Sequence, residues 1–147
     1  MTESINRLKE ALREGTTYVN QVSESELIDK VSPEKWSKKE IVGHLIDSAV
    51  NNLQRFTEIQ FEDKPYPIRK YNQDDLVIAN DYQNAEINEM LDFWNSINNR
   101  IMYLMKIQTE ETLDYQIELE KDTFSDLRFL MVDYVDHLVH HLKQIMH

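Results

Sequence analysis

Residues 123–146 read TFSDLRFLMVDYVDHLVHHLKQIM and carry the pattern that decides the fold. At about 100° per residue, six side chains of this stretch fall on one helix face, within roughly 60° of Leu127: Leu130, Met131, Tyr134, Leu138, Leu142 and Ile145. His141 lies about 40° from the centre of that face and His137 about 80° to the same side, whereas His140 lies about 140° away. The stretch therefore predicts a helix whose core edge carries a pair of imidazoles, His137 and His141.

A second helix is predicted upstream of a proline-containing break. Ser37 followed by Glu40 forms a capping-box signature, which indicates that a helix begins near Ser37 and runs to about Phe61. Pro65 and Pro67 then interrupt the helical pattern, because proline removes a backbone donor and restricts the preceding residue.

The apolar pattern is helical in most of the remaining chain. The other expected segments are an opening helix over residues 5–22 with a weak point at Gly15, a helix over residues 85–107, a short helical turn within residues 74–82 and a connector over residues 109–119. Thr123 with Asp126 offers a cap for the last helix, which is expected to run through about Met146. Four long helices with three connections predict an all-α four-helix bundle that spans residues 1–147 as one domain.

The composition of the chain disfavours several functional classes. The 147 residues include no cysteine, which leaves no disulfide framework, cysteine nucleophile or thiolate ligand. A formal net charge of −11 disfavours binding to nucleic acid or to an anionic membrane surface. No apolar run approaches the roughly 20 residues of a membrane span, and residues 1–4 open no secretory signal. We therefore expect a soluble, cytoplasmic protein, and homodimerisation is left open.

A polar stripe flanks the core of the helix that begins near Ser37. With Ile41 as the angular reference, four polar side chains at steps of four, three and four fall within a band roughly 60° wide. These are His44, Ser48, Asn51 and Arg55. Each buried polar group costs free energy unless it finds a partner, so a polar cavity lined by all four explains them together. The alternative explanation for the stripe is a partly exposed seam between helices. The alternative explanation for His137 and His141 is that they are core-edge histidines hydrogen-bonded to neighbouring side chains.

Two motifs resemble those of the DinB-like superfamily of metal-binding four-helix bundles. The first is WSKKEIVGHLIDS at residues 36–48, in which a Trp-Ser lead-in precedes the first metal histidine of the family, and NNLQRF at residues 51–56 continues it. The second is HLVHH at residues 137–141, whose first and last histidines are the ligands in that family. The resemblance covers nearly the whole chain. It implies that the metal ligands here are His44, His137 and His141.

The resemblance also implies a class of activity. Relatives in this superfamily include bacillithiol and other thiol S-transferases as well as metal-dependent hydrolases. A small-molecule substrate is implied only by this resemblance. A divalent metal, zinc or nickel, and a low-molecular-weight thiol as co-substrate are implied in the same way. Three neutral imidazoles leave coordination positions open for water or substrate, and a bound divalent metal lowers the pKa of a coordinated water or thiol.

The sequence therefore predicts a metal-dependent thiol S-transferase or hydrolase. Its substrate is expected to be positioned by Ser48, Asn51 and Arg55, and Arg55 suits the carboxylate of a thiol cofactor. An ion pair with an acidic residue of a neighbouring helix is the alternative role for Arg55. A non-catalytic, stress-associated bundle that binds a metal or another ligand is the alternative for the whole protein.

Aromatic residues offer further expectations. Trp36 and Trp94 fit apolar helix faces or helix lead-ins and are expected to serve in packing. Tyr66, Tyr71 and Tyr82 lie in or near the proline-containing break. Two roles are open for these tyrosines: they cover the core, or they form a lid over the site.

Overall fold

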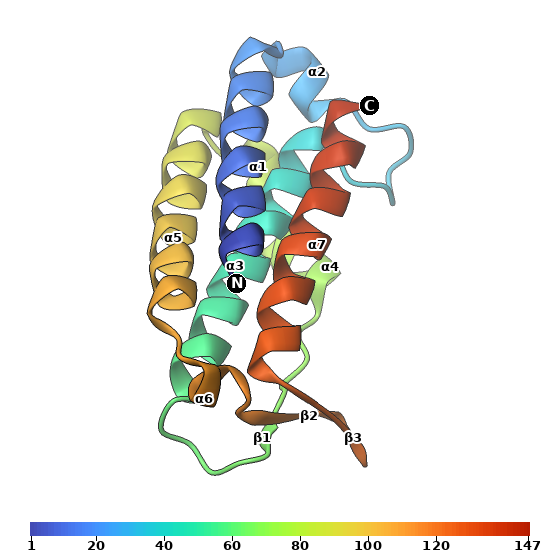
Figure 1. The fold of residues 1–147 in the computed structure, drawn as a ribbon. Helices are drawn as coiled ribbons and strands as arrows, with labels where there is room; N and C mark the ends of the chain where they lie inside the picture. The colour runs from blue at the N-terminus through green and yellow to red at the C-terminus, as the bar shows by residue number, and fades with distance from the viewer.

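The computed structural model describes residues 1–147 and confirms the four-helix bundle (Figure 1). The four long helices are α1 (Thr2–Gln21), α3 (Lys38–Glu58), α5 (Ile87–Ile107) and α7 (Leu127–Met146). Both α1 and α3 pack against α5 and α7, so α1 and α3 lie on a diagonal of the bundle. No helix combines the length and the apolar content that crossing a lipid bilayer requires. The interface between α3 and α7 brings the two histidine-bearing helices together.

The helix starts follow local capping chemistry. The Ser37 hydroxyl accepts the Glu40 amide at 3.1 Å, and the Glu40 carboxylate accepts the Ser37 amide at 3.0 Å, which confirms the predicted capping box. At the start of α7, the Asp126 carboxylate accepts the amide of Phe129 at 2.8 Å. Thr123 does not cap this helix, because it lies in a strand that ends where the helix begins.

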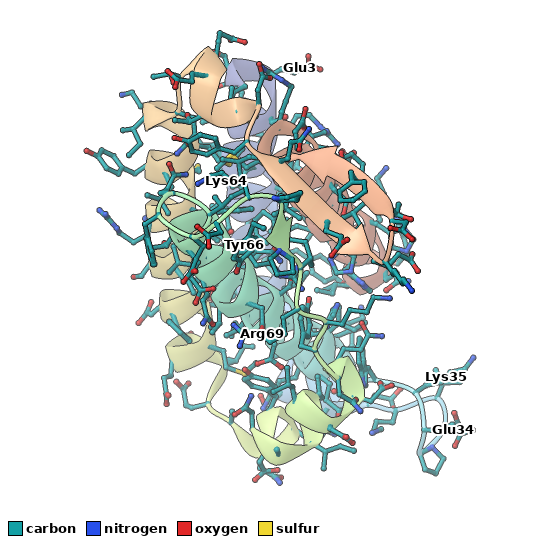
Figure 2. All side chains as sticks on the ribbon, turned by 90° about the horizontal axis from the view of Figure 1, so that it is seen from below. Glu3, Glu34, Lys35, Lys64, Tyr66 and Arg69 are labelled. Atoms are coloured by element: carbon teal, nitrogen blue, oxygen red, sulfur yellow. The ribbon has the colours of Figure 1, made fainter.

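A small sheet at one end of the bundle was not predicted from the sequence. It consists of β1 (Tyr66–Pro67), β2 (Gln116–Glu120) and β3 (Thr123–Asp126) in the order β1-β2-β3. β1 runs parallel to β2, and β2 runs antiparallel to β3. Figure 2 shows Tyr66 between the labelled Lys64 and Arg69 on the chain segment that this pairing holds against the bundle. The sheet therefore fixes the proline-containing break in place.

Short helical elements occupy the connections between the long helices. They are α2 (Glu24–Ile28), α4 (Gln73–Ala79), the 3-10 turn η1 (Tyr82–Asn84) and α6 (Glu110–Leu113). The expected turn within residues 74–82 is present as α4, and the expected connector over 109–119 holds α6 and most of β2.

Gly15 does not interrupt α1, although the sequence marked it as a weak point. A Cβ at this position would lie 2.8 Å from Leu142 Cδ1 and 2.9 Å from Trp94 Cη2. The missing side chain lets α1 approach α5 and α7 closely, so this glycine serves packing. Trp94 is buried in the core, as its expected packing role requires.

Leu138 provides a test of the bundle core. Its side chain is 1 % exposed at the centre of the buried face of α7. Leu138→Ala should lower the free energy of unfolding by about 2–5 kcal/mol, because truncation leaves a cavity that the neighbours fill only in part. Urea denaturation followed by circular dichroism measures this, with the exposed Lys143→Ala as control. A loss no larger than that of Lys143→Ala would contradict the core assignment.

Candidate metal centre

Three imidazoles converge between α3 and α7. Each of His44, His137 and His141 offers one ring nitrogen, and these nitrogens lie within 4.8 Å of one another. The Nε2 atoms of His137 and His141 are 3.1 Å apart. Two nitrogen ligands of one tetrahedral ion, each at about 2.0–2.1 Å, lie about 3.3 Å apart. The spacing of the α7 pair is thus close to that of ligands sharing an ion.

His44 carries the strongest sign that the cluster accommodates a ligand. Its side chain is fully buried, and neither Nδ1 nor Nε2 has a hydrogen-bond partner. Unpartnered buried polar atoms cost free energy and are rare in folded proteins. A metal ion bound to one of the two nitrogens would remove the cost of that nitrogen, so the residues present fit a divalent ion.

Hydrogen bonding at the core edge explains part of the cluster. His141 Nδ1 donates to Gln144 Oε1 at 2.8 Å, one turn further along α7. This bond holds the His141 ring with Nε2 facing the other two imidazoles. Histidines that bind metal ions usually donate their second ring nitrogen to such an acceptor, which fixes the orientation of the ring. The same explanation fails for His44, which has no such partner.

The electrostatics keep the cluster neutral. Burial, strengthened by the neighbouring imidazoles, lowers the pKa of His44 to about 3 and that of His137 to about 4. Burial also lowers the pKa of His141. All three rings are therefore uncharged near neutral pH, which is the form that binds metal ions. His140 is exposed and lies outside this cluster, as the helical angles predict.

Trp36 covers one side of the histidine cluster. Its ring lies 4.7 Å from the His44 ring, centroid to centroid, with an interplanar angle of 33°, and 6.5 Å from the His141 ring. The sequence assigned Trp36 to packing but did not reveal that its packing partner is an imidazole. The available signal was its place directly before Ser37, the cap of the histidine-bearing helix.

A cavity of about 120 Å³ adjoins the cluster between α3 and α7. Its lining residues are Ser48, Asn52, Arg55, Tyr71, Leu130, Asp133, Tyr134 and His137. Ser48 and Arg55 of the predicted polar stripe therefore face the same space as a histidine of the cluster. Of the three tyrosines near the proline-containing break, Tyr71 alone lines this cavity.

Asn51 does not line this cavity, and Asn52 lies in the cavity wall where Asn51 was expected. The Asn51 side chain donates to the Asp47 carbonyl at 2.8 Å and lines a smaller adjoining cavity that Arg55 also borders. The difference comes from the angular reference. The buried residues Leu45, Ala49 and Phe56 show that the centre of the core face lies about 60° from Ile41. Measured from that centre, Asn52 is closer to the core than Asn51 is.

Arg55 has no carboxylate partner. Its guanidinium donates to the Arg69 carbonyl at 2.6 Å and to Asn52 Oδ1 at 3.4 Å, and it lies over the Tyr71 ring at 5.4 Å. The ion pair considered as an alternative for Arg55 is absent from the structure. Burial lowers the pKa of this guanidinium. Arg55 lacks a carboxylate partner although the chain has 27 aspartates and glutamates against 16 lysines and arginines.

The other two tyrosines hold connections in place. The Tyr66 hydroxyl donates to Glu58 at 2.7 Å, and the Tyr82 hydroxyl donates to Asp47 at 2.6 Å. Both bonds attach loop segments to α3.

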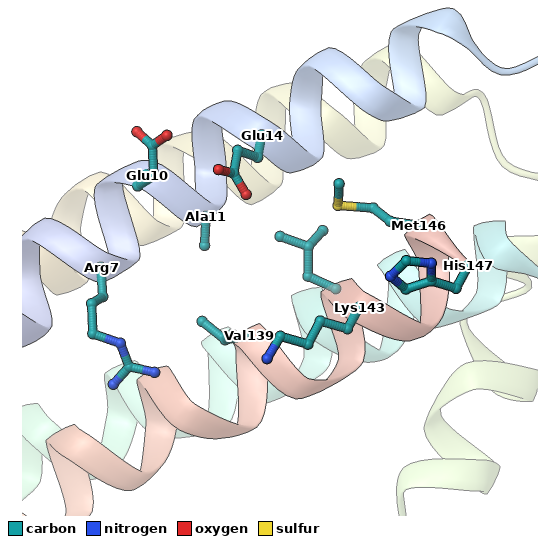
Figure 3. A pocket seen from close by; sticks show the side chains of 9 residues that line it. Arg7, Glu10, Ala11, Glu14, Val139, Lys143, Met146 and His147 are labelled. Atoms are coloured by element: carbon teal, nitrogen blue, oxygen red, sulfur yellow. The ribbon is translucent and has the colours of Figure 1, made fainter.

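A larger groove of about 290 Å³ lies between α1 and α7 (Figure 3). Arg7, Glu10 and Glu14 of α1 and Lys143 of α7 surround an apolar floor. None of the three clustered histidines lines this groove. The cavity that adjoins the histidine cluster is therefore the smaller one beside His137, not this groove.

Four helices, two of which bring three neutral imidazoles together, define a helical bundle with a candidate metal centre. The chain belongs to the DinB superfamily, whose family model matches residues 7–145. A protein of Bacillus pumilus (strain SAFR-032) with the name "Putative metal-dependent hydrolase" is 29% identical over 143 residues, which cover 96% of this chain and 80% of that protein.

Two solved structures share the fold. YfiT from Bacillus subtilis, described as a probable metal-dependent hydrolase with an unusual four-helix bundle topology, matches 99% of this chain and 83% of its own, with a TM-score of 0.87 and 22% identity. A mycothiol-dependent maleylpyruvate isomerase matches 98% of this chain and 60% of its own, with a TM-score of 0.73 and 10% identity. At these identities the likenesses support the fold alone.

The lowered pKa values predict how the metal-free protein responds to acid. Below the ordinary histidine pKa of about 6.5, the unfolded chain binds protons on these rings, whereas folded His44 stays neutral to about pH 3. The unfolded state then holds more protons, so the free energy of unfolding falls as the pH drops from about 7.5 to about 5.

Urea denaturation of the metal-free protein at the two pH values measures this loss. His44→Gln should show a smaller loss between them, and the exposed His140→Gln is the matched control. Equal pH dependence in all three proteins would contradict the burial of a neutral His44.

Proposed function

We propose that this protein is a metal-dependent hydrolase that holds a divalent ion, zinc or nickel, on His44, His137 and His141. The observation that carries the proposal is the buried His44 ring, whose two nitrogens lack partners beside two further neutral imidazoles. The DinB family and the Bacillus pumilus relative support a metal-dependent enzyme. The proposal treats residues 1–147 as one domain that contains the whole centre.

The surrounding residues determine how such a centre works. A divalent ion supplies Lewis-acid activation of a water or thiol near neutral pH. Gln144 orients the His141 ring through the Nδ1 hydrogen bond. Trp36 shields one side of the imidazoles from water, so substrate approaches from the cavity that His137 lines.

The cavity walls indicate the position of a substrate. The buried Ser48 lies on the cavity wall next to His137 and offers a hydroxyl there. Arg55 offers a guanidinium that no carboxylate neutralises, which suits an anionic group of the substrate. Asn52 accepts one Arg55 hydrogen bond and so orients it. Asn51 remains a candidate contact through the small adjoining cavity that it shares with Arg55.

A thiol S-transferase is the second candidate. The observation in its favour is the unpaired Arg55, since low-molecular-weight thiol cofactors that carry carboxylates need a cationic subsite beside the metal. Turnover that requires an added thiol separates the transferase from the hydrolase. A non-catalytic bundle would bind metal without turnover of either kind.

Metal content tests the centre directly. Protein purified without an affinity tag should contain about one equivalent of zinc or nickel, and His137→Ala should lose most of it, because removal of one of three ligands weakens the site. Inductively coupled plasma mass spectrometry measures the metal, and circular dichroism checks the fold.

His140→Ala is the matched control, because His140 lies on the same helix outside the cluster. It should keep its metal and its metal-dependent hydrolysis of 4-nitrophenyl acetate. Equal metal content in His137→Ala and the native protein would contradict the assigned ligands.

A further inference from the structure

Asp133 lines the cavity beside the histidine cluster and has no assigned role. It lies on α7, one helical turn before His137, so both side chains project from the same side of that helix. Its carboxylate makes no ion pair, neither with Arg55 nor with any other cation. Arg55 lines the cavity from α3, the other helix that forms the wall.

The electrostatic environment shows that the two opposite charges do not compensate each other. Asp133 is exposed at the rim of the cavity, where the desolvation that remains raises its pKa and the nearby Asp136 raises it further. Asp136 itself pairs with Arg7 at 2.7 Å, whereas Asp133 pairs with no arginine or lysine. The cavity thus presents one uncompensated anion and one uncompensated cation.

We propose that the substrate bound in this cavity is zwitterionic, with a carboxylate held by Arg55 and a protonated amine held by Asp133. This inference rests on the proposed function, since it takes the cavity beside His137 to be the substrate site. A ligand with both charges satisfies both groups at once. A purely anionic ligand would leave the Asp133 carboxylate to repel it, and a purely cationic one would meet Arg55 in the same way.

The size of the cavity limits the recognised group. The cavity volume of about 120 Å³ is room for several water molecules and no more than a small organic group. A short amino-acid moiety fits that space, while the rest of a larger substrate must extend outside it. The substrate class is therefore a small amino acid, or a larger molecule that ends in an amino-acid group.

Three probes with one carbon skeleton test the inference: 4-aminobutanoate, butanoate and butan-1-amine. Each is titrated into zinc-loaded and metal-free protein near neutral pH, and affinities are measured by NMR chemical-shift changes. The variants are Asp133→Asn and Arg55→Gln. The exposed Asp92→Asn and Arg100→Gln on α5 are matched controls, because they remove the same charges away from the cavity.

The inference requires 4-aminobutanoate to bind more tightly than either single-charge probe. Asp133→Asn should weaken 4-aminobutanoate about tenfold, the usual value of one charge-assisted contact, and leave butanoate no weaker. Arg55→Gln should weaken 4-aminobutanoate and butanoate alike. Neither control should change any of the three affinities.

The outcomes separate this inference from the proposed function. If 4-aminobutanoate binds no better than butanoate, or if Asp133→Asn leaves its affinity unchanged, the zwitterion inference is wrong whatever the metal content. If the protein holds no metal but 4-aminobutanoate binding still depends on Asp133 and Arg55, the metal-dependent function fails and the zwitterion site stands.

Discussion

The packing of α3 against α7 is the constraint on which the site depends. It buries His44 completely and places its ring nitrogens beside His137 and His141, where no protein group can satisfy them. The same interface forms the cavity in which Ser48 and Arg55 face Asp133. The candidate metal centre and the adjoining cavity are therefore two parts of one helix–helix interface, and the surrounding core fixes the position of both.

Burial explains how an acidic protein maintains a neutral cluster. The chain carries a formal charge of −11, yet desolvation lowers the pKa of each clustered histidine and keeps the rings uncharged. Trp36 adds to this desolvation by covering the His44 ring. The unpaired ring nitrogens that destabilise the metal-free fold are the atoms that favour binding of an ion, so stability and metal affinity are coupled.

Local patterns were enough to predict the helices and the histidine pair, but not the surroundings of the site. Apolar periodicity and the Ser37 capping box depend on near neighbours in the chain, and both were confirmed. The pairing of β1 with β2 was missed because it joins distant segments through very short strands, whereas β2 and β3 are neighbours in the chain whose residues the pattern assigns to a connector and a helix cap. Asn51 was expected in the cavity wall instead of Asn52 because the helical angles were measured from Ile41, which is only half-buried. The unpaired states of Arg55 and Asp133 depend on which residues fold against them, which no helical angle contains.

X-ray absorption spectroscopy of the zinc-loaded, tag-free protein tests the central claim most directly. The account predicts three imidazole nitrogens in the first coordination shell at about 2.0–2.1 Å, with further light-atom scattering from water. His44→Ala should reduce the imidazole contribution to two rings or abolish zinc binding. A shell made of carboxylate oxygens, or an unchanged spectrum in His44→Ala, would contradict the three-histidine centre.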